Sequence, residues 1–264
     1  MSHLNTNPVD YQPSISVVIY SYNTEKTIEV CIISAELLTS EIMLIDFEST
    51  DETVELAEKK GVAVQKIPHS NFVEPARNTG MLNADTDWVF ILDDDERITK
   101  ELAEEILTAI RSDEYSYYRI PRKEFFAKKV WLKHGGWWPN TQVRLIKKVD
   151  FQEWPSQIHS FPKIQGNEGQ LKHAFLHYSK NDYFTIVNKT INFENIESDL
   201  LFKANKPVNT LTFFRKFLAE LYRRMFKWQG YKDGTIGIIE SIYQAFSKTI
   251  TYLYLYEKKN SRTV

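Results

Sequence analysis

The feature that most constrains the fold is a fourfold alternation of short apolar runs with amphipathic segments in the first 111 residues. The first run is continuous and apolar, which is typical of a strand covered on both faces, and the second and fourth runs each end in a carboxylate. The first amphipathic segment carries apolar residues at helical spacing. The runs are residues 15–20, 41–46, 62–67 and 88–93, and the helices are expected at about 25–38, 51–60, 75–84 and 100–111. This order predicts an α/β fold on a mainly parallel sheet.

Local signals indicate where three of these helices begin. Ser49 and Glu52 have the spacing of a capping box for the segment 51–60. Pro75 suits the first turn of the third helix. Thr99 can cap the fourth helix.

Carboxylates stand where the predicted strands end, and ligands of open α/β sheets bind at that edge. Asp46 ends the second run, and the sequence Asp93-Asp94-Asp95-Glu96 begins at the end of the fourth. Four adjacent acids are costly to gather unless a cation neutralises them. In an extended segment Asp93 and Asp95 point the same way, and their oxygens suit Mg²⁺ or Mn²⁺. The alternative is a solvated acidic turn before the fourth helix.

Beyond residue 112 the pattern changes. Strand-like segments follow without regular helices, and the chain becomes helical again at about 182–200, 209–227 and 235–257. Cys31, the only cysteine, falls on the apolar face of the first helix, so it is expected in the core.

Charge and hydropathy argue against two classes, membrane-spanning proteins and nucleic-acid-binding proteins. The net charge is −2, and no run of about 18 apolar residues or N-terminal signal core is visible, so we expect a cytoplasmic protein. Residues 201–264 hold twelve Lys and Arg against four Asp and Glu. The acidic front half argues against a nucleic-acid binder.

Three segments of the first half resemble family 2 glycosyltransferases: ISVVIYSYNTEKTI, LIDFESTDETVELA and ARNTGMLNADTDWVFILDDDE. Four later segments resemble a bacterial subgroup that includes lipopolysaccharide-core glucosyltransferases: HGGWWPNTQVRLIKK, QIHS, LHYSKNDYFTIVNKTINF and GYKDGTIG. The resemblance implies a GT-A fold and inversion at the anomeric carbon. It also implies a nucleotide-sugar-binding half at 14–125, an acceptor-binding half at 126–200 and a basic helical appendage at 201–264.

The resemblance implies a nucleoside pocket around the first two strands. Asp46 matches the aspartate that binds base or ribose, although it could merely cap a turn. Asp51 matches the Asp of the S-T-D segment, but a helix's first turn favours an acid in any case. The loop residues that line the pocket would be Tyr20, Ser21, Asn23 and Glu25.

A diphosphate and metal site is implied around the fourth strand. Arg77 and Asn78 match a basic-polar pair, in which Arg can clamp a diphosphate. A surface position is the alternative for Arg77. Asp93 and Asp95 match the D-x-D motif with Asp94 between them, and Mn²⁺ or Mg²⁺ there would stabilise the leaving nucleotide.

The general base that inversion needs is in doubt. Related sequences often read V-H-E where this chain reads Ile158-His159-Ser160, so Ser160 stands in place of a glutamate. His159 is the nearest candidate and Glu153 the next. A structural histidine and a solvated glutamate remain the alternatives.

Four further residues are candidates in the second half. His177 lies where some GT-A enzymes place a late metal or phosphate ligand, and Arg144 could reach the diphosphate or the acceptor. Trp137 and Trp138 sit in a Gly-Pro loop, where their flat faces could stack on a sugar of the acceptor or plug the base of this half.

The tail contains a basic amphipathic helix. One face carries Leu211, Phe214, Leu218, Leu221, Tyr222 and Met225. Such a helix can lie on an anionic membrane, which would suit a lipid-linked acceptor at the cytoplasmic face. We expect instead that this face packs on the main domain or on another subunit, because amphipathic helices mostly pack against a core.

These observations favour a metal-dependent inverting glycosyltransferase. It would move a sugar from a nucleotide-sugar donor, expected to be a UDP-sugar, to a glycan or lipid-linked acceptor in cell-surface polysaccharide or lipopolysaccharide synthesis. A scaffold that kept the fold and lost turnover is one alternative, supported by Ser160. A nucleotidyltransferase is another, but the loop SYNTEKT lacks the glycines that a triphosphate needs.

Overall fold

The computed structural model describes residues 12–70, 73–112, 114–127, 129–156, 160–180 and 183–260. The chain forms two compact units. The first comprises residues 1–121 and 141–176, and the second comprises 122–140 and 177–264. The sequence-based boundaries at 125 and 200 fall inside the strand β6 (Tyr117–Phe126) and the helix α5 (Tyr183–Lys203).

The first unit is built on the four predicted parallel strands. They are β1 (Ile15–Ser21), β2 (Ile42–Asp46), β3 (Ala63–Lys66) and β4 (Trp88–Asp93). β1 lies at the centre of this group, because it pairs in parallel with both β2 and β4. The carboxyl ends of the strands therefore meet at one edge of the sheet, as the sequence predicts.

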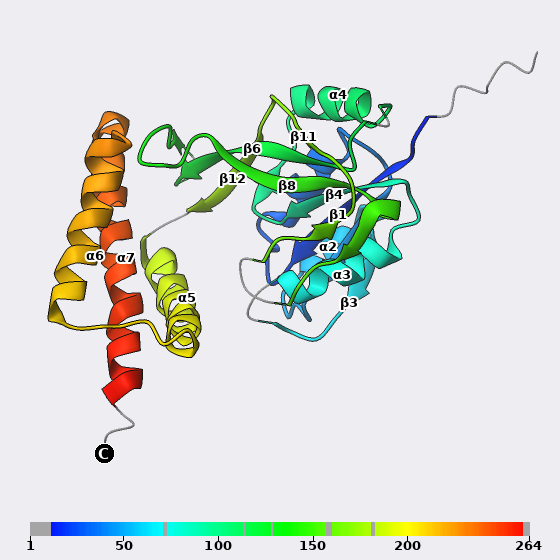
Figure 1. The fold of residues 1–264 in the computed structure, drawn as a ribbon. Coiled ribbons are helices and arrows are strands. Elements are labelled where there is room, and N and C mark those ends of the chain that lie inside the picture. The colour runs from blue at the N-terminus through cyan, green and yellow to red at the C-terminus, as the bar shows by residue number, and fades with distance from the viewer. Residues whose placement is uncertain are drawn as a thin grey trace, which may run out of the picture. The chain divides into compact units, whose positions relative to one another are not determined.

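Helices cover both faces of this sheet (Figure 1). One face packs against α1 (Ile28–Ala35), α2 (Thr53–Lys59) and α4 (Lys100–Ala109) through residues such as Val17 and Phe90, which are fully buried. The opposite face packs against α3 (Glu74–Asn83) through the intervening residues. Cys31 on α1 is fully buried, so its expected place in the core is confirmed.

The sheet becomes mixed beyond β4. Its strand order is β3-β2-β1-β4-β8-β6-β12-β5, and β8 (Asn140–Lys147) is antiparallel to β4. The short β5 (Glu96–Arg97) closes this order. The remaining strands are β7 (Val130–Trp131), β9 (Phe151–Glu153), β10 (Lys163–Ile164), β11 (Glu168–Gln170) and β12 (Phe175–Lys180), with a 3₁₀ turn at Lys148–Asp150.

Two of the predicted helix starts are confirmed, and one is wrong. The Thr99 hydroxyl accepts a hydrogen bond from the backbone N–H of Leu102, and α3 carries a proline in its first turn. The capping box of Ser49 and Glu52 does not form. The N–H of Ser49 instead donates to the Asp46 carboxylate at 2.9 Å, because that carboxylate ends the neighbouring strand.

The second unit is mainly helical. It contains α5, α6 (Thr210–Tyr222) and α7 (Gly234–Asn260), and α7 lies between the other two (Figure 1). A π-helical turn, η2 (Arg223–Lys227), and a 3₁₀ turn, η3 (Gly230–Asp233), join α6 to α7. Among the described residues, no helix combines the length and hydropathy needed to cross a bilayer.

Candidate functional site

Strand register brings the predicted site residues of the first unit together. Tyr20 pairs with Asp93 across β1 and β4, and Ser21 pairs with Asp46 across β1 and β2. These four residues therefore line the carboxyl edge side by side. Ser21 and Asp46 are almost completely buried.

Two buried arginines hold the Asp93 carboxylate. Arg77 Nη2 donates to Asp93 Oδ1 at 2.9 Å, and Arg144 Nη2 donates to Asp93 Oδ2 at 2.7 Å. The same Arg144 nitrogen lies 2.6 Å from Glu96 Oε1, and the second oxygen of Glu96 accepts from the Asp93 N–H at 3.0 Å. The network thus has two positive and two negative groups, with one charged residue from each of α3, β4, β5 and β8.

Burial and charge oppose each other at this network. Burial alone would lower the pKa of Arg144, but the nearby carboxylates of Asp93 and Glu96 hold it above its ordinary value. Burial raises the pKa of the Tyr20 hydroxyl, which donates to the carbonyl oxygen of Arg77 at 3.2 Å. Arg144 therefore keeps its charge, and Tyr20 stays neutral.

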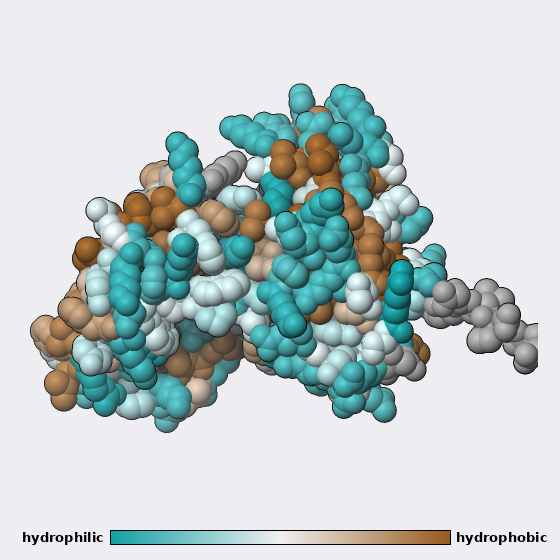
Figure 2. All heavy atoms as spheres, turned by 90° about the horizontal axis from the view of Figure 1, so that it is seen from above, coloured by the Kyte–Doolittle hydropathy of each residue, from teal (hydrophilic) through white to brown (hydrophobic). Residues whose placement is uncertain are grey.

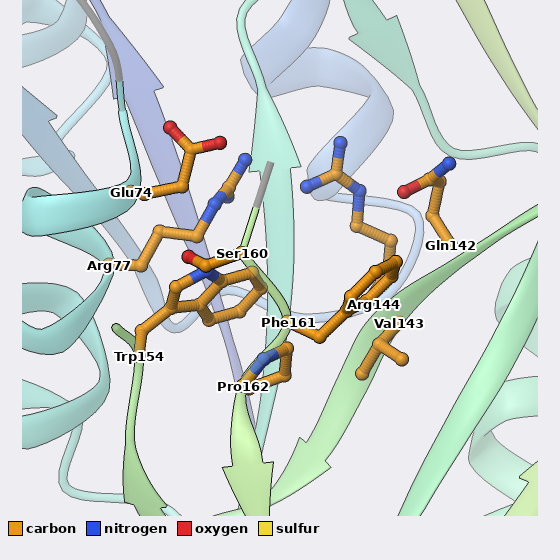
Figure 3. A pocket seen from close by; sticks show the side chains of 9 residues that line it. All are labelled: Glu74, Arg77, Gln142, Val143, Arg144, Trp154, Ser160, Phe161 and Pro162. Carbon is orange, nitrogen blue, oxygen red and sulfur yellow. The ribbon is translucent and has the colours of Figure 1, made fainter. Parts of the chain in front are cut away.

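A pocket of about 230 Å³ opens beside the two arginines. Figure 3 shows their guanidinium groups toward the same end of the pocket, above Trp154 and Phe161, with the Glu74 carboxylate at that end as well. The nine lining residues are Glu74, Arg77, Gln142, Val143, Arg144, Trp154, Ser160, Phe161 and Pro162.

Three buried N–H donors of the pocket residues have no hydrogen-bond partner within the described part of the chain. They are Arg77 Nη1, Arg144 Nε and Trp154 Nε1. Buried donors are nearly always satisfied, so an unsatisfied group calls for an explanation. These donors belong to residues around one pocket, and the two guanidinium groups suit a ligand with several acceptor oxygens.

The other predicted partner of Arg77 positions the wall of the pocket. The Asn78 side chain exchanges two hydrogen bonds with the backbone of Trp154, both of 2.7 Å. This pair fixes Trp154 beside Arg77, whose guanidinium lies 5.0 Å from the ring centroids of both Tyr20 and Trp154. Asn78 therefore acts on the site through Trp154.

Asp46 offers an unsatisfied acceptor at the same edge of the sheet. The residue is fully buried, and Oδ2 accepts from the Ser49 N–H. Oδ1 is buried without a hydrogen-bond partner among the described residues. A ligand N–H or O–H group would satisfy it.

The loops after β1 and β2 are joined to each other. The backbone N–H of Glu25 donates to Asp51 Oδ2 at 3.1 Å, and the Asn23 side chain accepts from the Thr50 N–H at 2.8 Å. Burial alone would raise the pKa of Asp51, but hydrogen bonds from Thr53 and Glu25 outweigh it and lower the pKa. Asn23, Glu25 and Asp51 thus hold the shape of the loop pair.

An exposed aromatic pair lies beside these loops. The rings of Tyr22 and His69 have centroids 4.2 Å apart, and Tyr22 is 42% exposed. Tyr22 belongs to the loop from Tyr20 to Asn23 that was predicted to line the pocket, whereas His69 was missed by sequence reasoning.

The acidic turn is tied to the first helix. Arg97 donates to the carbonyl oxygens of Asp94 and Thr27, at 2.8 and 3.1 Å, and Asp94 and Asp95 are half-buried. Glu96, which the sequence placed in a cation-binding run, is fully buried and faces Arg144. In the described part of the chain, no three His, Cys, Asp or Glu side chains gather into a metal-binding group.

The predicted bases are placed differently. His159 lies outside the described residues. Glu153 is exposed and pairs with Lys163 at 2.6 Å, and Ser160 lines the pocket. Among the nine described residues that line the pocket, Glu74 is the only one with a carboxylate, and sequence reasoning missed it.

The remaining candidates belong to the second unit. His177 Nδ1 lies 2.7 Å from Glu124 Oε2, and its role as a metal ligand stays a prediction. Trp137 and Trp138 are half-buried, with Arg224 5.1 Å from the Trp137 ring centroid. His134, in the same loop, lies 2.6 Å from Asp233 of the GYKDGTIG segment.

Comparisons of the sequence with a family model and with related proteins agree on one family. The model of glycosyl transferase family 2 matches residues 16–163. A protein described as an uncharacterized glycosyltransferase from Rickettsia conorii is 26% identical over 256 residues, covering 92% of this chain and 90% of that protein. One from Rickettsia prowazekii is 26% identical over 253 residues, covering 89% and 84%.

The fold agrees with this family. The crystal structure of Staphylococcus aureus TarS 1-349 in complex with UDP-GlcNAc matches with a TM-score of 0.50 at 15% identity, covering 94% of this chain and 92% of that one. The predicted α/β GT-A fold is thereby confirmed, and the nucleotidyltransferase alternative is set aside. The chain belongs to glycosyl transferase family 2 and is a glycosyltransferase.

Proposed function

We propose that the enzyme transfers a sugar, with inversion, from a UDP-sugar to an acceptor hydroxyl at the pocket of the first unit. The observation that carries this proposal is the set of unsatisfied donors of Arg77, Arg144 and Trp154 around that pocket. A diphosphate offers several charged oxygens in a small volume, and guanidinium groups bind such oxygens strongly. Asp93 would position both arginines.

The uridine would lie on the opposite side of Asp93 from the sugar. The N3–H of a uracil ring can donate to the unsatisfied Asp46 Oδ1. The exposed ring of Tyr22, backed by His69, offers a flat surface for stacking on a base. Asn23, Glu25 and Asp51 would keep this loop pair in shape.

The half-buried carboxylate of Asp95, in the turn after β4, would hold a divalent cation, as the D-x-D motif implies. Both oxygens of Asp93 accept from arginines, so Asp93 would act by positioning them. Mg²⁺ or Mn²⁺ is commonly held by one or two carboxylates together with substrate phosphates and water. The bound cation would neutralise charge on the departing diphosphate. His177 remains a proposed further ligand.

The base would remove the proton from the acceptor hydroxyl while its oxygen attacks the anomeric carbon and the bond to the diphosphate breaks. Glu74 is the group that the pocket offers for this step, because its carboxylate lies beside the arginines (Figure 3). His159 is the competing candidate from the sequence, and Glu153 the less suitable one, because it is exposed and does not line the pocket.

For the acceptor we propose a glycan or lipid-linked sugar used in cell-surface polysaccharide or lipopolysaccharide synthesis in the cytoplasm. Trp137 and Trp138 would offer stacking faces for it. This part rests on the likeness of the segments HGGWWPN and GYKDGTIG to the lipopolysaccharide-core subgroup.

The test is release of UDP from UDP-glucose, UDP-galactose and UDP-N-acetylglucosamine, each with and without Mn²⁺. We expect one donor to be turned over, with Asp95→Asn and Glu74→Gln strongly impaired and Glu168→Gln unchanged. Glu168 is a matched control, because it is an exposed carboxylate that pairs with Arg119 and does not line the pocket. If Glu74→Gln keeps full turnover and His159→Gln loses it, the base is His159. No UDP release above the rate without enzyme would favour the non-catalytic scaffold.

A further inference from the structure

The helix α6 presents a broad apolar face to solvent. Its large side chains recur at the spacing of one helical face and continue into the π-helical turn η2. Their exposed fractions are 73% for Leu211, 65% for Phe214, 58% for Leu218, 63% for Tyr222 and 59% for Phe226. We call this set the α6 face. The expectation that this side of the helix packs on the main domain or on another subunit stays a prediction, and in the described structure these side chains are exposed.

The other side of α6 accounts for its packing. Phe213 contacts Tyr256 of α7 with ring centroids 6.3 Å apart, and Lys216 lies over the ring of Tyr252 at 5.0 Å. The helix also begins at a complete capping box formed by Asn209 and Thr212. The inner side of α6 thus packs on α7, and its N-terminus is capped. None of these contacts uses a residue of the α6 face.

Cations border the apolar residues, and carboxylates do not. Arg215 and Lys227 are exposed between them. In the segment 210–227, all of it described, the only carboxylate is Glu220. Glu220 is 7% exposed and pairs with Arg223 and Arg224, so it does not lie on the α6 face.

A second exposed apolar row lies on the neighbouring helix. Ile238, Ile242 and Phe246 of α7 recur every four residues and are 39%, 46% and 52% exposed. Figure 2 shows brown apolar side chains gathered on the helical part of the chain, at the left of the view. Large apolar side chains gathered at the surface in this way indicate a protein or membrane contact.

We propose that the α6 face docks on the surface of a lipid bilayer that carries anionic headgroups. Aromatic and aliphatic side chains flanked by Arg and Lys are the composition that inserts at such an interface. A second copy of the chain fits less well. Two α6 faces brought together would place their cations against each other, with no carboxylate on either face to neutralise them. This inference does not depend on the proposed donor or reaction.

The test is sedimentation of the full chain with vesicles of phosphatidylcholine alone and of phosphatidylcholine mixed with phosphatidylglycerol. We expect binding to the anionic vesicles that falls at least tenfold in the double variant Phe214→Glu/Leu218→Glu. Arg215→Glu and Lys227→Glu should each weaken binding by roughly fivefold or more, since a cation near an anionic surface contributes about 1 kcal/mol. Raised salt should weaken the binding of the wild type.

A matched control is Leu82→Glu, which places the same charge on a leucine of α3 that is 66% exposed. It should bind vesicles as the wild type does, and circular dichroism should show all variants folded. Failure to bind either kind of vesicle, or binding that survives Phe214→Glu/Leu218→Glu, would overturn the proposal. A wild-type dimer in light scattering that Leu218→Glu converts to a monomer would assign the α6 face to a second copy instead.

Discussion

The pocket of the first unit buries charged residues, whereas the α6 face of the second unit exposes large apolar ones. At the pocket, Arg77, Arg144 and Glu96 are at most 5% exposed, although charged residues normally lie in water. On the α6 face, Leu211 and its neighbours are more than half exposed, although large apolar residues normally lie in the core.

This difference indicates what kind of ligand or partner each region suits. Buried charges cost free energy unless they are paired, and the pairing around Asp93 still leaves donors unsatisfied. That arrangement suits a small, highly charged ligand. Exposed apolar side chains cost little until they meet a surface, which suits an extended partner. Departures from local rules tend to mark functional sites.

The largest effect on stability is expected when the pocket network loses one partner. Arg144→Met should leave Glu96 and Asp93 buried with too little positive charge, which lowers the free energy of unfolding by about 3–5 kcal/mol. The exposed pair of Arg119 and Glu168 is the control, and Arg119→Met should cost no more than about 1 kcal/mol. Urea denaturation measures both free energies of unfolding. If Arg144→Met and Arg119→Met lose the same amount, the buried network stabilises the protein no more than an exposed ion pair does.

A large effect on activity and a small one on stability is expected at the acidic turn. Asp95→Asn should lower the rate of UDP-sugar turnover by roughly 100-fold, because one metal ligand contributes several kcal/mol of charge stabilisation. Its unfolding free energy should stay within about 0.5 kcal/mol of the wild type. Unchanged turnover with saturating Mn²⁺ would contradict the role of Asp95.

A smaller effect with a defined pH dependence is expected at the loop pair. The folded state lowers the pKa of Asp51, so its carboxylate stabilises the protein above the unfolded value of about 3.9 and loses this contribution as pH falls through the folded pKa. Asp51→Asn should therefore cost about 1 kcal/mol or less at neutral pH. The difference in unfolding free energy between Asp51→Asn and the wild type should shrink in acid. A difference that grows as the pH falls would contradict a lowered pKa of Asp51 in the folded state.

The smallest effect is expected on the α6 face. Leu218→Ser should change the unfolding free energy by no more than about 0.5 kcal/mol, because the side chain is already exposed. Leu92→Ala, at a fully buried position of β4, should cost about 2–5 kcal/mol. A loss above 2 kcal/mol at Leu218, measured by thermal denaturation, would mean that another part of the protein covers this face in solution.

Much of the first unit follows from local pattern. The four parallel strands were predicted to within one residue at either end. β1, β2 and β4 are largely apolar and buried, whereas β3 is the partly exposed edge strand. The meeting of Asp46 and Asp93 at one edge followed from the parallel order. Both results depend on short-range sequence alone.

The remaining features depend on contacts between distant segments. The pairing of Glu96 with Arg144 joins residues 48 positions apart, so the acidic run showed no sign that its last member turns inward. Glu74 and Trp154 reach the pocket from α3 and from the segment after β9. Periodicity predicted the apolar side of α6, but it could not tell that this side is left uncovered.

The most direct test of the donor site is thermal stability with UDP, with and without Mn²⁺. UDP at about 100 times its dissociation constant should add roughly 2.7 kcal/mol of stability. We predict that the wild type gains this shift only with Mn²⁺, that Asp95→Asn loses it, and that Glu168→Gln keeps it. No shift with saturating UDP and Mn²⁺, or a full shift in Asp95→Asn, would contradict a metal-dependent diphosphate site at this edge of the sheet.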